Sequence, residues 1–307
     1  TKAMKNMKIG IPKALLFYHY GDLWTSFFEE LGCDIIVSCN TTREMVEWGT
    51  RFSVDEACLA MKIYMGHVYY LLDKCDYILV PRIICLKKKE KLCTNFSALY
   101  DLVRNTFDKK IVHYNIDVAK KEDEFYAFVT MGLELGFKYR DIVKSYRKAK
   151  EKQMAIKTRK ISKQKAIVAS TKKIKILLAG HAYNLRDEFI GKPISKMLEE
   201  NDVEVIYSDC YDTKYLEKEV KKISPHNYWT YNKEIIASVE HYLDSVDGVI
   251  LLTVFPCGPD SLSNEMNLRK VDIPIIPIII DDESGNAGII TRIESFLDIL
   301  EERRHQA

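Results

Sequence analysis

The feature that most constrains the fold of this chain is a repeated alternation between short apolar runs and amphipathic segments. In the first half the runs are rich in Val and Ile, and the segments between them carry apolar residues at helical spacing. Such runs are typical of parallel strands that are buried on both faces. The expected strands are Met7–Ile11, Asp34–Cys39, Tyr77–Ile83 and Ile111–Asn115, and the expected helices are Asp22–Leu31, Leu59–Leu72, Leu99–Thr106 and one that Thr42 caps and that runs through Trp48.

The second half repeats this pattern. Two successive β-α-β-α series predict an α/β protein built from two doubly wound, Rossmann-like (flavodoxin-like) domains. With 307 residues, 47% of them hydrophobic, the chain is long enough for a core in each domain. The second set of expected strands is Lys175–Ala179, Glu204–Ser208, Val249–Thr253 and Ile275–Ile280, and the expected helices are Phe189–Glu200, Asn232–Leu243, Ser261–Lys270 and Ala287–Glu301.

A strongly basic stretch separates the two halves. Residues 138–175 contain 15 Lys and Arg against Asp141 and Glu151, and subtracting this excess of 13 from the net +2 leaves −11 for the remainder. Good helix formers without Gly or Pro predict a long helix that ends near Ile167. We favour a solvated connecting helix over a docking surface for an acidic partner or a phosphate-bearing ligand. The expected division is an N-terminal domain at 7–137 carrying Cys58 and Cys93, a basic connector at 138–170, and a C-terminal domain at 171–307 carrying Cys257.

Missing motifs exclude several common α/β chemistries. No G-x-G-x-x-G follows a strand, and the chain has no P-loop, no H-E-x-x-H and no G-x-S-x-G. The near balance of 46 basic and 44 acidic side chains excludes a dedicated nucleic-acid binder, and no apolar run reaches the roughly 18 residues of a membrane helix. Residues 1–6 are polar and lack the apolar core of a secretion signal, so we expect a cytoplasmic protein.

Cysteines are the residues most suited to carry chemistry here. None of the eight, at positions 33, 39, 58, 75, 85, 93, 210 and 257, belongs to a C-x-x-C pair. In a reducing compartment such residues pack in the core, act as nucleophiles or bind metals. Cys58, Cys93 and Cys257 lie in loops that a doubly wound fold brings to the carboxyl ends of strands, where helix N-termini favour anions such as a thiolate-bound iron–sulfur cluster. Spacing alone favours packing for isolated cysteines, and Cys33 and Cys75 are expected to pack, whereas Cys210 is either packed or at the surface.

Several ordered motifs extend over nearly the whole chain. They are Ile9–Leu15, Ser53–Cys58, Lys62, Gly66–Val68, Val80–Ile83, Tyr228–Trp229, Cys257–Ser261, Asp282–Glu283 and Gly288–Phe296. In this order the motifs resemble the 2-hydroxyacyl-CoA dehydratase family. The resemblance is to its D-component-like branch, which includes relatives of acyl-CoA dehydratase activases and of double-cubane cluster proteins.

This resemblance implies two Rossmann-like domains with an oxygen-sensitive iron–sulfur cluster in the cleft between them. Carried over by motif, Cys58, Cys93 and Cys257 would hold a [4Fe–4S] cluster and leave one iron open to water, a thiol or a substrate oxygen. Double-cubane relatives hold an [8Fe–9S] cluster with additional cysteines. Cys39 and Cys85 lie at expected strand ends, so this larger cluster or a fourth ligand stays open.

Polar side chains beside these cysteines are candidates for orienting the ligands or moving protons. Asp55 and Glu56 could equally stabilise the N-terminus of the following helix, and His67 has the alternative of a satisfied core histidine. The candidates are Ser53, Asp55, Glu56, Lys62, His67 and Ser261, whereas Arg82, Arg292 and Glu294 suit an interdomain ion pair somewhat better than substrate binding.

The resemblance also implies a mechanism and partners. An ATP-dependent activator protein would donate a low-potential electron, which the cluster passes to an acyl-CoA or another small reducible substrate, as in a reductase or a dehydratase lyase. A homodimer is expected from the family, with no nucleic acid and no membrane. The alternative from a different class is a non-catalytic carrier of a cluster or of electrons, and a third interpretation is an α/β protein with a degenerate site that binds no iron.

Overall fold

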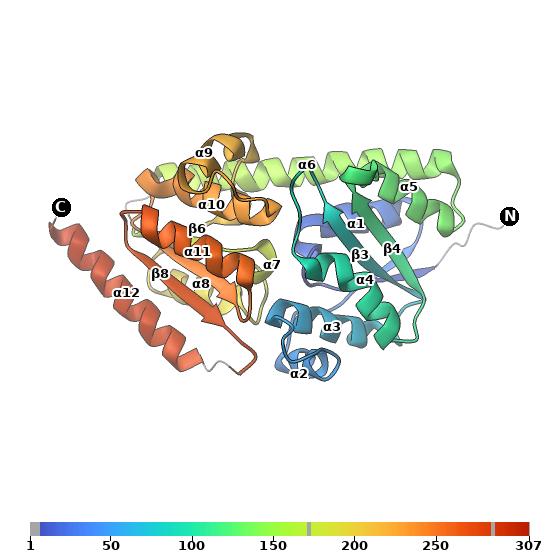
Figure 1. Cartoon of the computed structure of the whole chain (residues 1–307), viewed down its shortest axis with the longest axis horizontal. Coiled ribbons are helices and arrows are strands. Elements are labelled where there is room, and N and C mark those ends of the chain that lie inside the picture. The colour runs from blue at the N-terminus through green and yellow to red at the C-terminus, as the bar shows by residue number, and fades with distance from the viewer. Residues whose placement is uncertain (1–6, 171–172, 284–285, 307) are drawn as a thin grey trace. The chain divides into compact units, whose positions relative to one another are not determined.

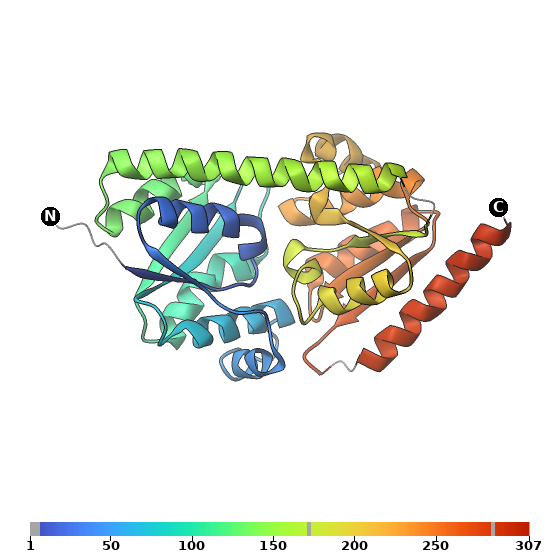
Figure 2. The same cartoon turned by 180° about the vertical axis from the view of Figure 1, so that it is seen from behind.

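The computed structural model describes residues 7–170, 173–283 and 286–306, and two opposite views show helices on both faces of each of its sheets (Figure 1, Figure 2). The expected polar lead at 1–6 lies outside the described residues. The chain divides into two compact units. The first unit runs through Lys157 and includes Tyr228–Thr230, and the second unit holds Thr158–Asn227 and the chain from Tyr231 on.

The sheet of the first unit is parallel, in the order β2-β1-β3-β4. Its strands are β1 (Lys8–Ile11), β2 (Asp34–Val37), β3 (Tyr77–Cys85) and β4 (Ile111–Asp117). All four expected strands are confirmed. Strand β3 runs two residues past the expected end at Ile83, so that Cys85 is its last residue.

Five helices of the first unit precede the basic stretch. They are α1 (Phe17–Glu30), α2 (Arg43–Arg51), α3 (Leu59–Leu71), α4 (Thr94–Thr106) and α5 (Glu124–Glu134). Helix α1 begins before the expected Asp22. The earlier start could not be predicted because the N-cap residue, Leu16, has no side chain that can form a capping hydrogen bond. Helix α5 was not expected, although Asp123 caps it by accepting from the Tyr126 backbone N–H at 2.8 Å.

The sheet of the second unit has the matching order β6-β5-β7-β8 and is also parallel. Its strands, all of which were expected, are β5 (Lys175–Ala179), β6 (Glu204–Tyr207), β7 (Gly248–Val254) and β8 (Ile275–Ile280). The helices are α7 (Ala182–Leu185), α8 (Gly191–Glu200), α9 (Leu216–Ile223), α10 (Thr230–Tyr242), α11 (Gly258–Lys270) and α12 (Asn286–Gln306).

The matching strand orders define where ligands are expected. In each sheet the chain moves outward from one central strand and then returns to start the other half, so β1 and β3, like β5 and β7, flank a switch point. Open parallel sheets bind ligands just beyond the carboxyl ends of the strands at such points. The loops that follow these four strands are therefore the first places to look for a site.

The basic stretch forms α6 (Tyr139–Ser170), which runs past its expected end near Ile167. The division between the units falls inside this helix, after Lys157. In the first unit Lys150 forms an ion pair of 2.7 Å with the first residue of α5. In the second unit the side-chain amide of Gln164 donates to the carbonyl of the last residue of β6 at 2.9 Å. Both units therefore anchor part of α6. None of the helices in the described ranges has the length and apolar character that a membrane crossing needs.

Candidate functional site

Each of the three cysteines expected to bind a cluster is the N-cap residue of a helix. Cys58 is the N-cap of α3, Cys93 of α4 and Cys257 of α11, and none makes a side-chain capping hydrogen bond. The first turn of a helix has backbone N–H groups without intrahelical acceptors, and its dipole favours negative charge. Each thiol therefore lies where a thiolate, or an anionic group bound by it, is stabilised.

In the first unit the start of α4 lies against Cys58. Asn95, two residues after Cys93, donates its side-chain amide to the sulfur of Cys58 at 3.6 Å. The quoted Tyr228–Trp229 motif is also close, because the backbone N–H of Lys91 donates to the carbonyl of Tyr228 at 2.9 Å. The structure thus brings Cys58 and the start of α4 together. Sequence analysis did not single out Asn95, because a lone side-chain amide is not part of a recognisable metal-binding motif.

The other candidates around Cys58 differ in their surroundings. Ser53 is half-buried, and its hydroxyl oxygen is enclosed without a hydrogen-bond partner. Asp55 and Glu56 are exposed and precede the N-cap, so neither lies in the first turn of α3. Lys62 is buried one turn into α3. The expected roles of these residues in proton transfer stay predictions.

His67 occupies the environment of a satisfied core histidine. Its ring is fully buried, with Nδ1 2.7 Å from the Ser38 hydroxyl and Nε2 2.9 Å from the Thr41 hydroxyl. Burial, with a smaller contribution from Lys13, lowers the pKa of His67 to about 3. An imidazole that is neutral and bonded at both nitrogens favours the core alternative over proton transfer.

This burial predicts an acid-sensitive stability. Below about pH 6.5 the unfolded chain binds a proton at His67, whereas the folded chain does so only near its lowered pKa. The free energy of unfolding therefore decreases as the pH is lowered through that interval. The expected contribution is up to about 1.4 kcal/mol per pH unit. Urea unfolding at pH 7.5 and 5.0 should show a smaller pH difference for His67→Asn than for wild type and for the exposed-histidine control His226→Asn. Equal differences in all three proteins would contradict the assignment.

The two further candidate ligands, Cys39 and Cys85, differ in their surroundings. Cys85 is buried and donates its thiol to the carbonyl of Lys87 at 2.9 Å. Cys39 is exposed and hydrogen-bonds Tyr70, whose pKa it raises. Tyr70 is twelve residues after Cys58, which is about 18 Å along a helix. Cys39 thus contacts the far end of α3 from Cys58, and its role as an additional ligand stays a prediction.

The remaining cysteines are packed in the core. Burial raises the pKa of Cys33 to about 11 and that of Cys210 to about 12, and it also raises the pKa of Cys75. A thiol that stays protonated is a poor ligand, because the thiolate is the form that binds metal. The packing interpretation therefore holds for Cys33 and Cys75, and Cys210 is packed rather than exposed.

The second unit contains a buried polar network beside Cys257. The Asp260 carboxylate lies 2.7 Å from Nε2 of His181 and accepts hydrogen bonds of 2.8 Å from the Thr253 hydroxyl and the Asn232 amide. Burial acts to raise the pKa of Asp260, but His181 and the two hydrogen bonds outweigh it and lower the pKa. Asp260 is therefore an ionised carboxylate, fully satisfied in the interior.

This network sits at the switch point of the second sheet. His181 follows β5, and Asp260 is in the first turn of α11, just after β7. Sequence reasoning missed the pair, since the two residues are far apart in the chain. The available signals were the position of Asp260 inside the Cys257–Ser261 motif and that of His181 directly after a strand.

Helix α11 was expected to begin at Ser261, and this expected start is wrong. The helix begins three residues earlier, at Gly258, because Pro259 supplies the fixed φ of a first helical turn and has no N–H to leave unbonded. Ser261 instead donates both its hydroxyl and its backbone N–H to the carbonyl of Cys257, at 2.8 and 3.1 Å. Its direct role is to hold the backbone of the cysteine.

Gly258 leaves the backbone beside Cys257 uncovered. A Cβ at this position would meet no atom of the chain within 4 Å, and φ lies outside the left-handed region. Packing and backbone conformation therefore do not explain a glycine here, whereas close approach of a bound group does. With the N-cap thiols, this uncovered backbone fits a thiolate-bound cluster. Within the described residues of each unit, however, no three His, Cys, Asp or Glu side chains are gathered as a metal site.

Arginine candidates make their contacts within their own units. Arg82 lies 4.0 Å from Asp101 and lines a pocket of about 110 Å³ at the carboxyl half of β3 and β4. Arg292 donates to the carbonyl of Pro277 at 2.7 Å. These contacts support structural roles in each unit for the two residues.

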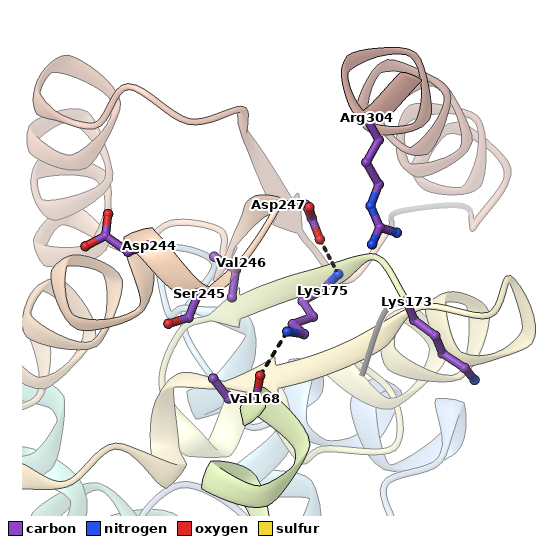
Figure 3. A pocket seen from close by; sticks show the side chains of 8 residues that line it. All are labelled: Val168, Lys173, Lys175, Asp244, Ser245, Val246, Asp247 and Arg304. Atoms are coloured by element: carbon purple, nitrogen blue, oxygen red, sulfur yellow. Dashed lines mark hydrogen bonds between the residues drawn. The ribbon is translucent and has the colours of Figure 1, made fainter. Parts of the chain in front are cut away.

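A larger pocket, of about 340 Å³, lies at the opposite, amino end of the second sheet (Figure 3). Two of its charged side chains are engaged, because the backbone N–H of Lys175 donates to Asp247 at 2.7 Å and the ammonium group of Lys175 donates to the carbonyl of Val168 at 2.9 Å. Lys173 forms an ion pair with Asp202. The pocket also lies at the amino ends of the strands, whereas open parallel sheets bind ligands beyond the carboxyl ends.

A comparison with known families links most of the chain to one of them. The family model described as "CoA enzyme activase uncharacterised domain" matches residues 8–211. This range contains Cys58 and Cys93, whereas Cys257 and Asp260 lie beyond it. Among curated proteins, none matches the chain.

Proposed function

Because this chain belongs to the family of the CoA enzyme activase domain, we propose that it is an iron–sulfur protein that serves the activation of a CoA-dependent enzyme. Membership of an activase-type family supports the expected link to activases of acyl-CoA dehydratases. It also corrects the D-component-like assignment, because the relation is to the activator side of that enzyme system.

We propose Cys58, Cys93 and Cys257 as the thiolate ligands of the cluster. The observation that carries this proposal is that all three are helix N-caps. Each helix start lowers the cost of a thiolate and of the anionic group bound to it. Burial raises the pKa of the packed Cys33 and Cys210, which keeps these two thiols protonated and makes them poor ligands.

A bound [4Fe–4S] cluster, or the alternative [8Fe–9S] cluster with Cys39 and Cys85, would supply one-electron transfer at low potential. The residues of this chain would tune and orient it. Asn95 donates to the sulfur of Cys58, and hydrogen bonds to ligand sulfur raise the reduction potential of such centres. Ser261 holds the carbonyl of Cys257 and so fixes the direction of its side chain.

The proposed electron donor is an ATP-dependent activator protein, and the proposed recipient is a dehydratase-type CoA enzyme. The family name favours the accessory role, in which electrons pass through the chain, over direct reduction or dehydration of an acyl-CoA. A homodimer remains the proposed assembly, and the cytoplasm the proposed compartment.

An anaerobic experiment tests this function. The full chain, reconstituted with iron and sulfide, is mixed with the activator and ATP, and reduction is followed by EPR. We expect an EPR signal that requires ATP and that decays when the CoA enzyme is added, but not when acyl-CoA alone is added. Decay with acyl-CoA alone would favour the catalytic alternative. A cluster-loaded chain that the activator never reduces would contradict the proposal.

A further inference from the structure

Helix α5 and the first part of α6 lie side by side in the first unit and form an antiparallel hairpin (Figure 1). Gly136, with a φ of +82°, follows the end of α5 and reverses the chain. The Tyr146 ring of α6 lies 5.1 Å from that of Phe128, and its hydroxyl donates to the Glu124 carboxylate at 2.8 Å. Lys150 pairs with the same carboxylate. These contacts fix how the two helices of the hairpin lie against each other.

Large apolar side chains are exposed on the outer face of this hairpin. In α5, Tyr126 is 46% and Leu133 is 50% exposed, and Val129 between them is half-buried. Spacings of three and four residues place these side chains in one row along the helix. At the start of α6, Tyr139 is 56% exposed, and Val143, four residues later, is half-buried. These five residues are the apolar strip.

The row of α5 and the row of α6 follow the same seam between the helices. Gly132 packs against Ile142, because a Cβ on this glycine would lie 2.6 Å from Cγ1 of that side chain. Both residues are buried, whereas Leu133 and Val143, which directly follow them, reach solvent. The strip is therefore one surface, and exposed apolar surfaces of this kind mark interaction sites.

A basic row borders the apolar strip on α6. Arg140, Lys144 and Arg147 are exposed and follow one another at spacings of four and three residues. Among the residues that the structure describes, none of the three has a partner in a side-chain ion pair. The neighbouring Lys148, by contrast, pairs with Glu30 of α1 at 2.7 Å. The basic row thus offers three unneutralised charges beside an apolar surface.

The other border of the strip is acidic. Asp123 and Glu134 are both exposed, and their spacing of eleven residues, three helical turns, places them on one side of α5. That side faces away from α6, because Glu134 lies 3.2 Å from His113 of β4. Carboxylates at this border repel an anionic membrane or a nucleic acid. A border with both signs of charge suits a protein partner.

We propose that the apolar strip and the basic row bind an amphipathic helix of a partner protein, with acidic side chains on the flank that lies along α6. The partner helix buries its apolar face on the strip, and its carboxylates pair with the basic row. From Tyr126 to Leu133 the strip is roughly 10 Å long, which matches two turns of a helix. The inference goes beyond the proposed function and does not depend on iron binding. It gives the first part of α6 the role of docking an acidic partner, which the sequence favoured less than that of a solvated connector.

Fluorescence anisotropy of a labelled, designed peptide tests this surface on the full chain. The probe is a helical peptide with leucines on one face and glutamates along one flank, and the control peptide has lysines in place of the glutamates. We expect saturable binding of the glutamate peptide that weakens as salt is added, and about tenfold weaker binding of the lysine peptide. Equal binding of the two peptides would overturn the proposal.

Variants locate the binding on the chain. Both Leu133→Ser and the double change Arg140→Glu with Arg147→Glu should weaken binding of the glutamate peptide about tenfold. The double variant should also bind the lysine peptide more tightly than wild type does, a gain that misfolding does not produce. The matched control, Lys218→Glu with Lys221→Glu at exposed sites of α9, should bind both peptides as wild type does. Unchanged binding by the Arg140 and Arg147 double variant would contradict the assignment.

Two other occupants of the strip are tested directly. Vesicles of phosphatidylserine and phosphatidylcholine should not bind the chain through the basic row, and Leu133→Ser should leave the sedimentation of the full chain unchanged. Vesicle binding that is lost in the Arg140 and Arg147 double variant would overturn the proposal in favour of a membrane surface. A wild-type dimer that Leu133→Ser dissociates would overturn it in favour of a second copy of this chain.

Discussion

Replacing Cys257 with serine should strip most of the iron from the anaerobically reconstituted protein, and we expect the same result for the serine variants of Cys58 and Cys93. Serine keeps the size of the side chain but removes the thiolate that binds iron. Even the loss of a residue that only supports a ligand weakens metal binding about 10- to 100-fold, so loss of a ligand should cost at least as much. The readout is iron and acid-labile sulfide per chain after desalting.

Two packed cysteines serve as matched controls, one in each unit. Cys75→Ala and Cys210→Ala should retain the iron content of the wild type, since both thiols are buried and have raised pKa values. Circular dichroism checks that every variant is folded. If the serine variants retain as much iron as these controls, the assigned ligand set is wrong. Iron loss in Cys39→Ala and Cys85→Ala as well would favour the larger [8Fe–9S] cluster.

The second large effect concerns the packing of α2 against α3. A Cβ at Gly66 would overlap the backbone carbonyl of Met45, and a Cβ at Gly49 would overlap that of Lys62. Backbone atoms cannot turn away as a side chain can, so the helices would have to separate. Overpacking a core typically costs about 1–3 kcal/mol, and we expect Gly66→Ala to lower the free energy of unfolding by at least this amount. Because α3 carries Cys58 as its N-cap, iron retention should fall in parallel.

Urea unfolding followed by circular dichroism measures this cost. The matched control is Gly288→Ala in α12, where a new Cβ meets no atom within 4 Å. Alanine there should be neutral, or stabilising by up to about 1 kcal/mol, because alanine is the better helix former and loses less backbone freedom on folding than glycine does. A Gly66→Ala protein as stable as the wild type would show that α2 and α3 are not packed as described.

The strands were predictable because their signal is local. Runs such as Val249–Thr253 and Ile275–Ile280 are apolar except for Thr253, and each forms a strand where the sequence places it. Helix starts were less predictable. The start of α4 at Thr94 has no acidic residue in its first turn and no capping bond from Cys93. Without such chemistry, nothing local distinguishes the first turn from the loop before it.

The residues of the candidate site were likewise predictable only where their signal is local in the sequence. The cysteines could be found because each lies in a local motif at a strand end, and the structure adds that each is a helix N-cap. The His181–Asp260 pair could not be found, since its two members come from different strand ends and meet only when β5 and β7 pair. His67 shows the reverse case, because its motif was visible but both ring nitrogens are bonded to hydroxyls.

The central claim is that the N-cap thiolates of this chain bind iron and inorganic sulfide. The most direct test is the iron and sulfide content, with Mössbauer spectra, of the full chain produced with iron-57, handled without oxygen and desalted after reconstitution. We predict equivalent, stoichiometric iron and sulfide with the spectrum of tetrahedral iron–sulfur sites. Iron no higher than in a folded variant with Cys58, Cys93 and Cys257 all replaced by alanine would contradict the account.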